Sequence, residues 1–153
     1  MDSEFLLKTG NPIIGSDYKI NKPFPNISLP SLKKKTSIKQ FIGKRKLAIN
    51  FFASWCVPCK TEHAVLTEFS DDFFIIGIAY KDEKEKVNKF LLDLGNPYKE
   101  IFIDLTGKSA IELGLYGVPE TYFVDEYGII KYKHVGPVNK KQFKDYILKM
   151  ENL

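Results

Sequence analysis

LAINFFASWCVPCKTEH, residues 47–63, begins with an apolar run and continues into the only two cysteines of the chain, Cys56 and Cys59. The nearly continuous apolar run at 47–54 predicts a strand that is covered on both faces of a sheet. After the cysteines, apolar residues recur at helical spacing, and Pro58 is suited to the first turn of a helix. We therefore expect the cysteines at a strand-to-helix junction.

The rest of the chain alternates strand and helix patterns. Prolines in the first forty or so residues indicate an irregular arm with a short edge strand near 27–29. Alternation that ends in a hairpin and a last helix predicts an α/β fold, with a central mixed sheet and helices on both faces. Strands are expected at 73–79, 100–104, 121–124 and 129–134, and helices at 59–70, 87–94, 107–113 and from Asn139, as N-cap, toward the C-terminus.

Composition indicates an ordinary globular domain and gives no sign of a nucleic-acid partner. The net charge of +4 comes from 23 basic and 19 acidic residues, which is typical of a solvated surface, and no nucleic-acid-binding module is recognisable. The longest apolar run is too short to span a bilayer, and no secretory signal is recognisable after the acidic start. We expect a monomer.

Three interpretations of the two cysteines compete. A disulfide that closes so small a loop stabilises a fold by only about 2 kcal/mol, so a purely structural bond is the weakest of them. Cys56, Cys59 and His63, with His134 elsewhere in the chain, are conceivable metal ligands. In the third interpretation the pair is redox-active: the helix N-terminus favours a thiolate at Cys56, and Cys59 resolves the mixed disulfide.

The stretch Trp55-Cys56-Val57-Pro58-Cys59 after an apolar strand resembles the thioredoxin superfamily. Further segments are similar to one branch, the cytochrome c maturation thiol-disulfide oxidoreductases of the CcmG/DsbE type. This resemblance implies a thioredoxin-like domain at 21–153, with an N-terminal extension and a short β-α insertion, preceded by an arm at 1–20. The segments are CKTEH (59–63), AYKDE (79–83), LGNPY (94–98), LYGVPET (115–121) and YGIIKYKHVG (127–136).

The same resemblance implies a function. Family members are periplasmic reductants of the haem-site cysteines of apocytochrome c, tethered to the inner membrane by an N-terminal segment that is not present in this chain. The implied partners are apocytochrome c, or a haem-ligation protein that holds it, and a membrane thiol-electron transporter of the DsbD/CcdA type. No cofactor is implied besides the redox-active Cys56–Cys59 disulfide.

The resemblance also assigns site residues. Cys56 is implied as the nucleophile, Cys59 as the resolving thiol, and Pro119 as a cis-proline that faces the pair. Trp55 is equally compatible with a core position and with a place beside the docking surface. The residues expected to bind the client protein are Trp55, Val57, Pro58, Val118 and Pro119.

Two carboxyl groups complete the expected site. Glu62 shares a helical stripe with Cys59, and Glu120 follows the implied cis-proline, so both are expected near the sulfurs, where negative charge raises the pKa of Cys56 and favours a reductant. One of them is expected to exchange a proton with Cys59. Thioredoxins carry an acid where this chain has Asn50, which makes Glu62 the natural substitute. Without the resemblance, Glu62 is equally well explained as an acid in the first turns of a helix, and Glu120 as an acid at an exposed strand edge.

Rival functions differ in client or in chemistry. A thioredoxin-like reductase with another client would share both cysteines, and a metal-binding module would use Cys56, Cys59 and His63 to hold a soft ion. A general oxidant or isomerase is less favoured, because such a protein needs a cysteine thiol of very low pKa and nearby carboxylates do not stabilise its thiolate.

Overall fold

The computed structural model describes residues 19–153, so nearly all of the expected arm at 1–20 lies outside the described residues. Five strands form one sheet in the order β3-β2-β1-β4-β5, in which β1, β2 and β3 are parallel and β4 is antiparallel to both of its neighbours. The elements are η2 (Ile38–Gln40), β1 (Leu47–Phe52), α1 (Val57–Phe69), β2 (Ile75–Tyr80), α2 (Lys84–Leu94), β3 (Glu100–Asp104), α3 (Lys108–Leu113), β4 (Glu120–Val124), β5 (Ile130–Val135) and α4 (Lys140–Glu151).

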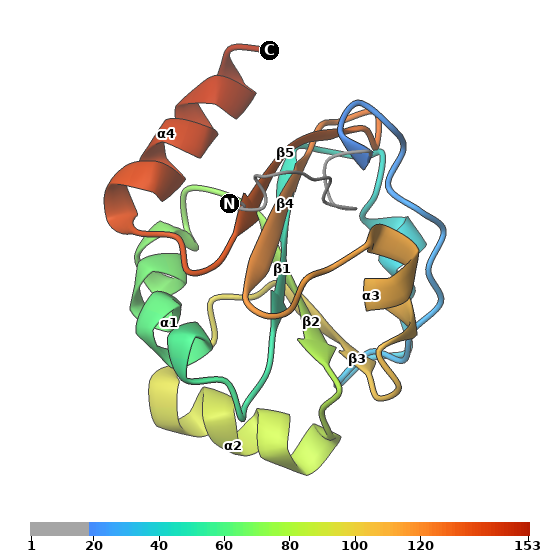
Figure 1. The fold of residues 1–153 in the computed structure, drawn as a ribbon, viewed down its shortest axis with the longest axis vertical. Coiled ribbons are helices and arrows are strands. Elements are labelled where there is room, and N and C mark those ends of the chain that lie inside the picture. The colour runs from blue at the N-terminus through green and yellow to red at the C-terminus, as the bar shows by residue number, and fades with distance from the viewer. Residues whose placement is uncertain (1–18) are drawn as a thin grey trace.

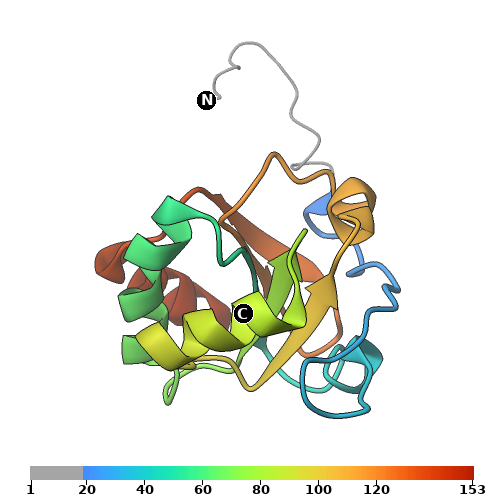
Figure 2. The same cartoon turned by 90° about the horizontal axis from the view of Figure 1, so that it is seen from below.

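Helices cover both faces of this sheet. Figures 1 and 2 show α1, α2 and α4 on one face, whereas α3 and the N-terminal segment with η2 lie on the other. Each face has its own apolar core, and strand side chains alternate between the two cores. The predicted mixed sheet with helices on both faces is confirmed. Within residues 19–153, no helix is both long and apolar enough to cross a membrane.

Local signals in the sequence account for most element boundaries. Asn139 caps α4, as predicted, and Gln142 closes a capping box with it. The β4–β5 hairpin turns at Gly128, whose φ of 83° is readily accessible only to glycine. The predicted edge strand at 27–29 is wrong: those residues lie in no strand, and between residue 19 and β1 only Pro23 and Ser31 form isolated bridges. The prolines of this stretch have no N–H to donate to a ladder.

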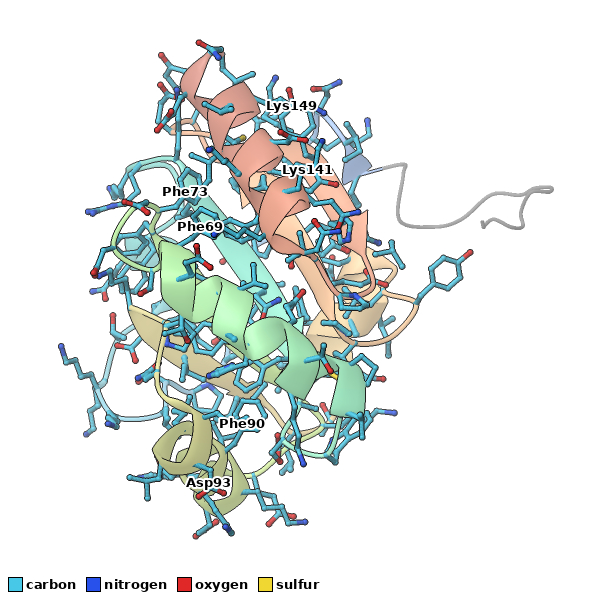
Figure 3. The ribbon with its side chains drawn as sticks, turned by 90° about the vertical axis from the view of Figure 1, so that its left-hand side faces the viewer. Phe69, Phe73, Phe90, Asp93, Lys141 and Lys149 are labelled. Atoms are coloured by element: carbon cyan, nitrogen blue, oxygen red, sulfur yellow. A yellow bond between two sulfur atoms is a disulfide. The ribbon has the colours of Figure 1, made fainter. Side chains whose placement is uncertain are left out.

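Helix α1 is held between two other helices by aromatic contacts. Figure 3 shows α1 with α4 on one side and α2 on the other, and labels Phe69 and Phe90 along these borders. Phe69 stacks on Phe143 of α4 with ring centroids 5.2 Å apart, and Phe90 of α2 lies 4.8 Å from the ring of His63. These contacts fix the helix that carries the cysteines.

Candidate active site

Cys56 and Cys59 form a disulfide at the N-terminus of α1. Cys56 is the N-cap residue, and the backbone N–H of Cys59 donates to its Sγ over 3.2 Å. The carbonyl oxygen of Val118 lies 3.7 Å from the same sulfur. Both cysteines are largely buried, so only a small part of Cys56 meets solvent. An N–H directed at Sγ and the helix dipole both favour a thiolate at Cys56 after reduction.

A buried carboxylate that the sequence did not single out fixes the turn before Cys56. Asp82 accepts hydrogen bonds from the N–H of Ser54 at 2.6 Å and from its hydroxyl at 2.9 Å. It also accepts from the N–H of Glu83 at 2.9 Å, at the start of α2. Asp82 therefore connects the end of β1 to α2, and its only signal in the sequence is its place in the segment AYKDE.

The side chains that adjoin Cys56 in the chain are apolar and exposed to solvent. Trp55 is 56% exposed and Val57 70% exposed, and Pro58 is exposed as well. The indole N–H of Trp55 donates to the carbonyl of Lys81 at 3.1 Å, which sets the ring on the surface and not in the core. The Val118–Pro119 peptide is cis, as the resemblance implied, and Pro119 is buried.

Glu62 lies at the centre of a buried hydrogen-bond network on the face of the sheet that α1 covers. Its Oε1 accepts from the side-chain amide of Asn50 at 3.0 Å, and its Oε2 accepts from the N–H of Val138 at 2.9 Å. The same amide of Asn50 donates to Thr121 at 3.0 Å, and its oxygen accepts from the Tyr98 hydroxyl at 2.8 Å. Glu62 is only 2% exposed, so the carboxyl depends on these donors in place of water.

Burial raises the pKa of Glu62 from 4.5 to about 7, although the hydrogen bonds from Val138 and Asn50 oppose the rise. The donors are all neutral, and none carries the positive charge that would keep the carboxyl ionised. At neutral pH both protonation states are therefore well populated. A carboxyl with this property can accept a proton and return it.

Glu120 lies on the opposite face of the sheet, because it precedes Thr121 on β4 and neighbouring strand residues point to opposite sides. Its carboxylate pairs with the ammonium of Lys133 at 2.8 Å and accepts from the N–H groups of Tyr116 at 2.8 Å and Gly117 at 3.3 Å. Burial raises its pKa, and the Lys133 charge opposes the rise. Glu62 thus lies on the face of the sheet that α1 covers, and Glu120 lies on the other face.

Neither histidine is arranged as a metal ligand. The Nε2–H of His63 donates to the carbonyl of Gly95 at 2.7 Å, which connects α1 to the end of α2. Both ring nitrogens of His134 are hydrogen-bonded within the β5–α4 region. In the part of the chain that the structure describes, no three His, Cys, Asp or Glu side chains gather closely enough to hold a metal ion.

Segments that carry the resemblance contact β1, α1 and the turn between them. AYKDE supplies Asp82 to Ser54, LGNPY supplies Gly95 to His63 and Tyr98 to Asn50, and LYGVPET supplies Val118 to Cys56. Their hydrogen bonds join parts of the chain that are far apart in sequence, for example Asn50 with Thr121. Sequence reasoning missed Tyr98, Thr121 and the N–H of Val138 as parts of the site, because hydrogen-bond partners across a sheet leave no local pattern.

The comparisons with known proteins agree with this geometry. The Redoxin family matches residues 19–147. The thiol:disulfide interchange protein CycY of Rhizobium leguminosarum bv. viciae is 49% identical over 67% of this chain, which spans only 56% of that protein. The thiol:disulfide interchange protein DsbE of Pasteurella multocida is 39% identical over 84% of this chain and 72% of its own length.

A solved structure extends the agreement to the fold. The crystal structure of a DsbE-type thiol:disulfide interchange protein from Chlorobium tepidum superposes with a TM-score of 0.75, at 21% identity, over 86% of this chain and 96% of that one. The expected thioredoxin-like fold is therefore confirmed.

Proposed function

The chain belongs to the Redoxin family and, within it, to the DsbE type of thiol:disulfide interchange proteins, and from this premise we propose that it reduces disulfides in the haem-site cysteines of apocytochrome c. The observation that carries the proposal is the Cys56–Cys59 disulfide at the start of α1, on the same face of the sheet as the buried carboxyl of Glu62. Haem can attach only to reduced cysteines, so such a reductant acts before haem ligation.

Cys56 is the nucleophile in this proposal. Its thiolate attacks one sulfur of the client disulfide, a new S–S bond joins Cys56 to the client, and the other client sulfur leaves as a thiolate that takes a proton from water. The position at the helix N-cap supports this role, because the N–H of Cys59 is directed at the sulfur.

Cys59 completes the exchange with the help of Glu62. The Cys59 thiol gives its proton to the Glu62 carboxylate, and the resulting thiolate attacks the Cys56 sulfur. The Cys56–Cys59 bond forms as the bond from Cys56 to the client breaks, and the second client sulfur leaves as a thiolate that takes a proton from water. Glu62 follows Cys59 by one helical turn on the buried side of α1, and its pKa of about 7 leaves enough carboxylate to accept the proton. Its negative charge also disfavours the thiolate form of the pair, which biases the couple toward giving electrons away.

The client binds across the apolar surface beside Cys56. Trp55 and Val57 are exposed on one side of this surface, and Val118 lies on the other with its carbonyl 3.7 Å from Sγ. An extended client segment can pair with the Val118 backbone while its side chains contact the apolar rim, which includes Pro58. Such backbone pairing suits an unfolded apocytochrome c.

The proposal extends to the cellular setting, by analogy with the family. The protein works in the periplasm beside the inner membrane, to which an N-terminal segment tethers it, and a membrane thiol-electron transporter of the DsbD/CcdA type returns Cys56 and Cys59 to the dithiol. Apocytochrome c, or a haem-ligation protein that holds it, receives the electrons. The protein acts as a monomer, with no cofactor besides the two cysteines.

The reduction potential tests the direction of electron flow. We expect a value below about −180 mV against glutathione or dithiothreitol, because nearby carboxylate charge disfavours the thiolate. A potential near the −120 mV that is typical of the oxidant DsbA would contradict the proposal.

A trapping experiment tests the client. Cys59→Ser should accumulate a mixed disulfide between Cys56 and apocytochrome c, since the resolving thiol is missing, whereas Cys56→Ser should trap nothing. Capture of an unrelated protein in place of a cytochrome or its ligation partner would favour a reductase with another client.

A further inference from the structure

One peptide group, between Pro137 and Val138, is hydrogen-bonded on both of its sides. Its N–H, on Val138, donates to Oε2 of Glu62 at 2.9 Å. Its carbonyl, on Pro137, accepts from Nε2–H of His134 at 3.2 Å. A single rigid and planar unit therefore connects the imidazole of His134 to the carboxyl of Glu62.

A second contact fixes the chemical form of His134. Its Nδ1 lies 3.0 Å from the Tyr146 hydroxyl of α4. Because Nε2 must donate to a carbonyl, Nδ1 of the neutral ring is the acceptor, and the hydroxyl donates to it. Burial lowers the pKa of His134, although the bond to the Pro137 carbonyl opposes this, and the neutral ring is the form that these partners require.

This chain of donors acts on Glu62 through the polarity of the peptide. Hydrogen bonds in sequence polarise one another, so donation to the Pro137 carbonyl makes the Val138 N–H a stronger donor. A stronger donor stabilises the ionised carboxylate. The bond from Val138 is the larger of the two hydrogen-bond effects that hold the Glu62 pKa down.

We propose that His134, oriented by Tyr146, is a positioning residue that holds the Pro137–Val138 peptide against Glu62 and so keeps a usable fraction of Glu62 ionised. The inference rests on the proposed function, because it concerns the group that accepts the Cys59 proton. His134 acts only through the peptide.

Other titratable and charged groups face this network. Tyr98 reaches Glu62 through Asn50 from the segment before β3, and Cys59 precedes Glu62 by one turn of α1. On α4, the ammonium of Lys149 lies 5.8 Å from the ring of Tyr146, and Figure 3 shows this lysine on that helix. Measuring the oxidised protein removes the cysteines from the titration, and the variants below leave Tyr98 and Lys149 unchanged.

The test is the pKa of the Glu62 carboxyl, followed by carbon-13 NMR in the oxidised protein labelled at glutamate. Glu62→Gln identifies the signal. In His134→Leu the peptide loses its donor, and we expect the Glu62 pKa to rise by about half a pH unit. His134→Gln retains an N–H donor near the position of Nε2 and should restore the value. Tyr146→Phe should raise the Glu62 pKa by less than His134→Leu does.

Tyr132→Leu is the matched control. Tyr132 lies two residues before His134 on β5, and its ring contacts that of Tyr146 at 6.1 Å, so this change removes packing from the same region without touching the peptide. We expect the Glu62 pKa of Tyr132→Leu to match the unsubstituted protein. Should His134→Leu fail to fold, the Glu62 pKa of Tyr146→Phe is compared with that of Tyr132→Leu instead.

Three results would overturn the inference: an unchanged Glu62 pKa in the variant that loses the donor, an equal rise in Tyr132→Leu, or a His134→Gln protein that behaves like His134→Leu. None of them depends on the reductase reaction. If Glu62→Gln leaves the release of client from Cys56 unaffected, the proposed role of Glu62 fails separately. The NMR result would still decide whether His134 controls that carboxyl.

Discussion

Glu62 and Glu120, the two most deeply buried glutamates among the described residues, lie on opposite faces of the sheet and have different partners. Glu62, under α1, is surrounded by neutral donors from Asn50 and Val138. Glu120, on the other face, pairs with Lys133 at 2.8 Å and receives two backbone N–H groups as well. Burial raises the pKa of both carboxyls, but only Glu120 has a cation that opposes this rise.

This difference shows that burial alone does not make a buried acid functional. The Lys133 ammonium opposes the rise in the Glu120 pKa, and the pair stabilises the fold as long as both charges remain. A carboxyl with neutral partners titrates near neutrality, where proton transfer is useful. We therefore propose a structural role for the Glu120 pair and a chemical role for Glu62, and the following predictions test that division.

The largest effect is expected from Lys133→Met. The change leaves the Glu120 carboxylate buried without its cation, and loss of one partner of a buried pair costs about 3–5 kcal/mol of stability. The loss should be greatest above neutral pH and smaller at pH 4, where Glu120 takes up a proton. Urea unfolding at several pH values measures it. The double variant Lys133→Met/Glu120→Gln should recover most of the loss; if it does not, the ion pair is not the cause.

The next effect is a change in the pH dependence of stability. The folded state raises the Glu62 pKa from 4.5 to about 7, so it binds the proton more tightly than the unfolded chain, and stability falls as pH rises through this window. The contribution amounts to about 3 kcal/mol and should disappear in Glu62→Gln. Denaturant unfolding between pH 4 and 8 measures it.

Glu68→Gln is the matched control for this profile, because Glu68 is a half-exposed carboxyl on the same helix and pairs with Lys140 on the surface. Its profile should follow that of the unsubstituted protein. A Glu62→Gln protein that keeps the full slope would show that another group causes it.

A smaller effect is expected on the redox couple. Removal of the Glu62 charge stabilises the thiolate form, so Glu62→Gln should raise the reduction potential by about 30 mV and make the protein a weaker reductant. Glu120→Gln should change the potential much less, because that carboxyl faces the other core and is paired. Equal shifts in the two variants, measured against glutathione, would remove the distinction between the faces.

The smallest effect is expected from Tyr98→Phe. It leaves the oxygen of Asn50 without the hydroxyl that lies 2.8 Å away, at a cost of about 1 kcal/mol. Thermal unfolding measures the loss. Tyr132→Phe removes a hydroxyl from a half-buried tyrosine of β5 and should be nearly neutral.

Local patterns predicted much of the fold. The apolar run before the cysteines, the helical spacing after them and the N-cap at Asn139 each marked the expected element, with boundaries shifted by a few residues. Such signals depend on residues close together in the chain, so a sequence displays them directly. The strand expected at 27–29 was wrong, because those residues pair with no strand and only Pro23 and Ser31, on either side of them, form isolated bridges.

The sequence by itself determined that two cysteines open a helix after a buried strand, and that Glu62 shares the buried stripe of that helix. The tertiary structure decided the surroundings of each acid: the side of the sheet on which Glu120 lies, its pairing with Lys133, and the donors that reach Glu62 from Asn50 and Val138. The physical reason is that proton affinity in a protein interior depends on the few dipoles and charges within hydrogen-bond distance. Those groups come from strands and loops that only folding brings together.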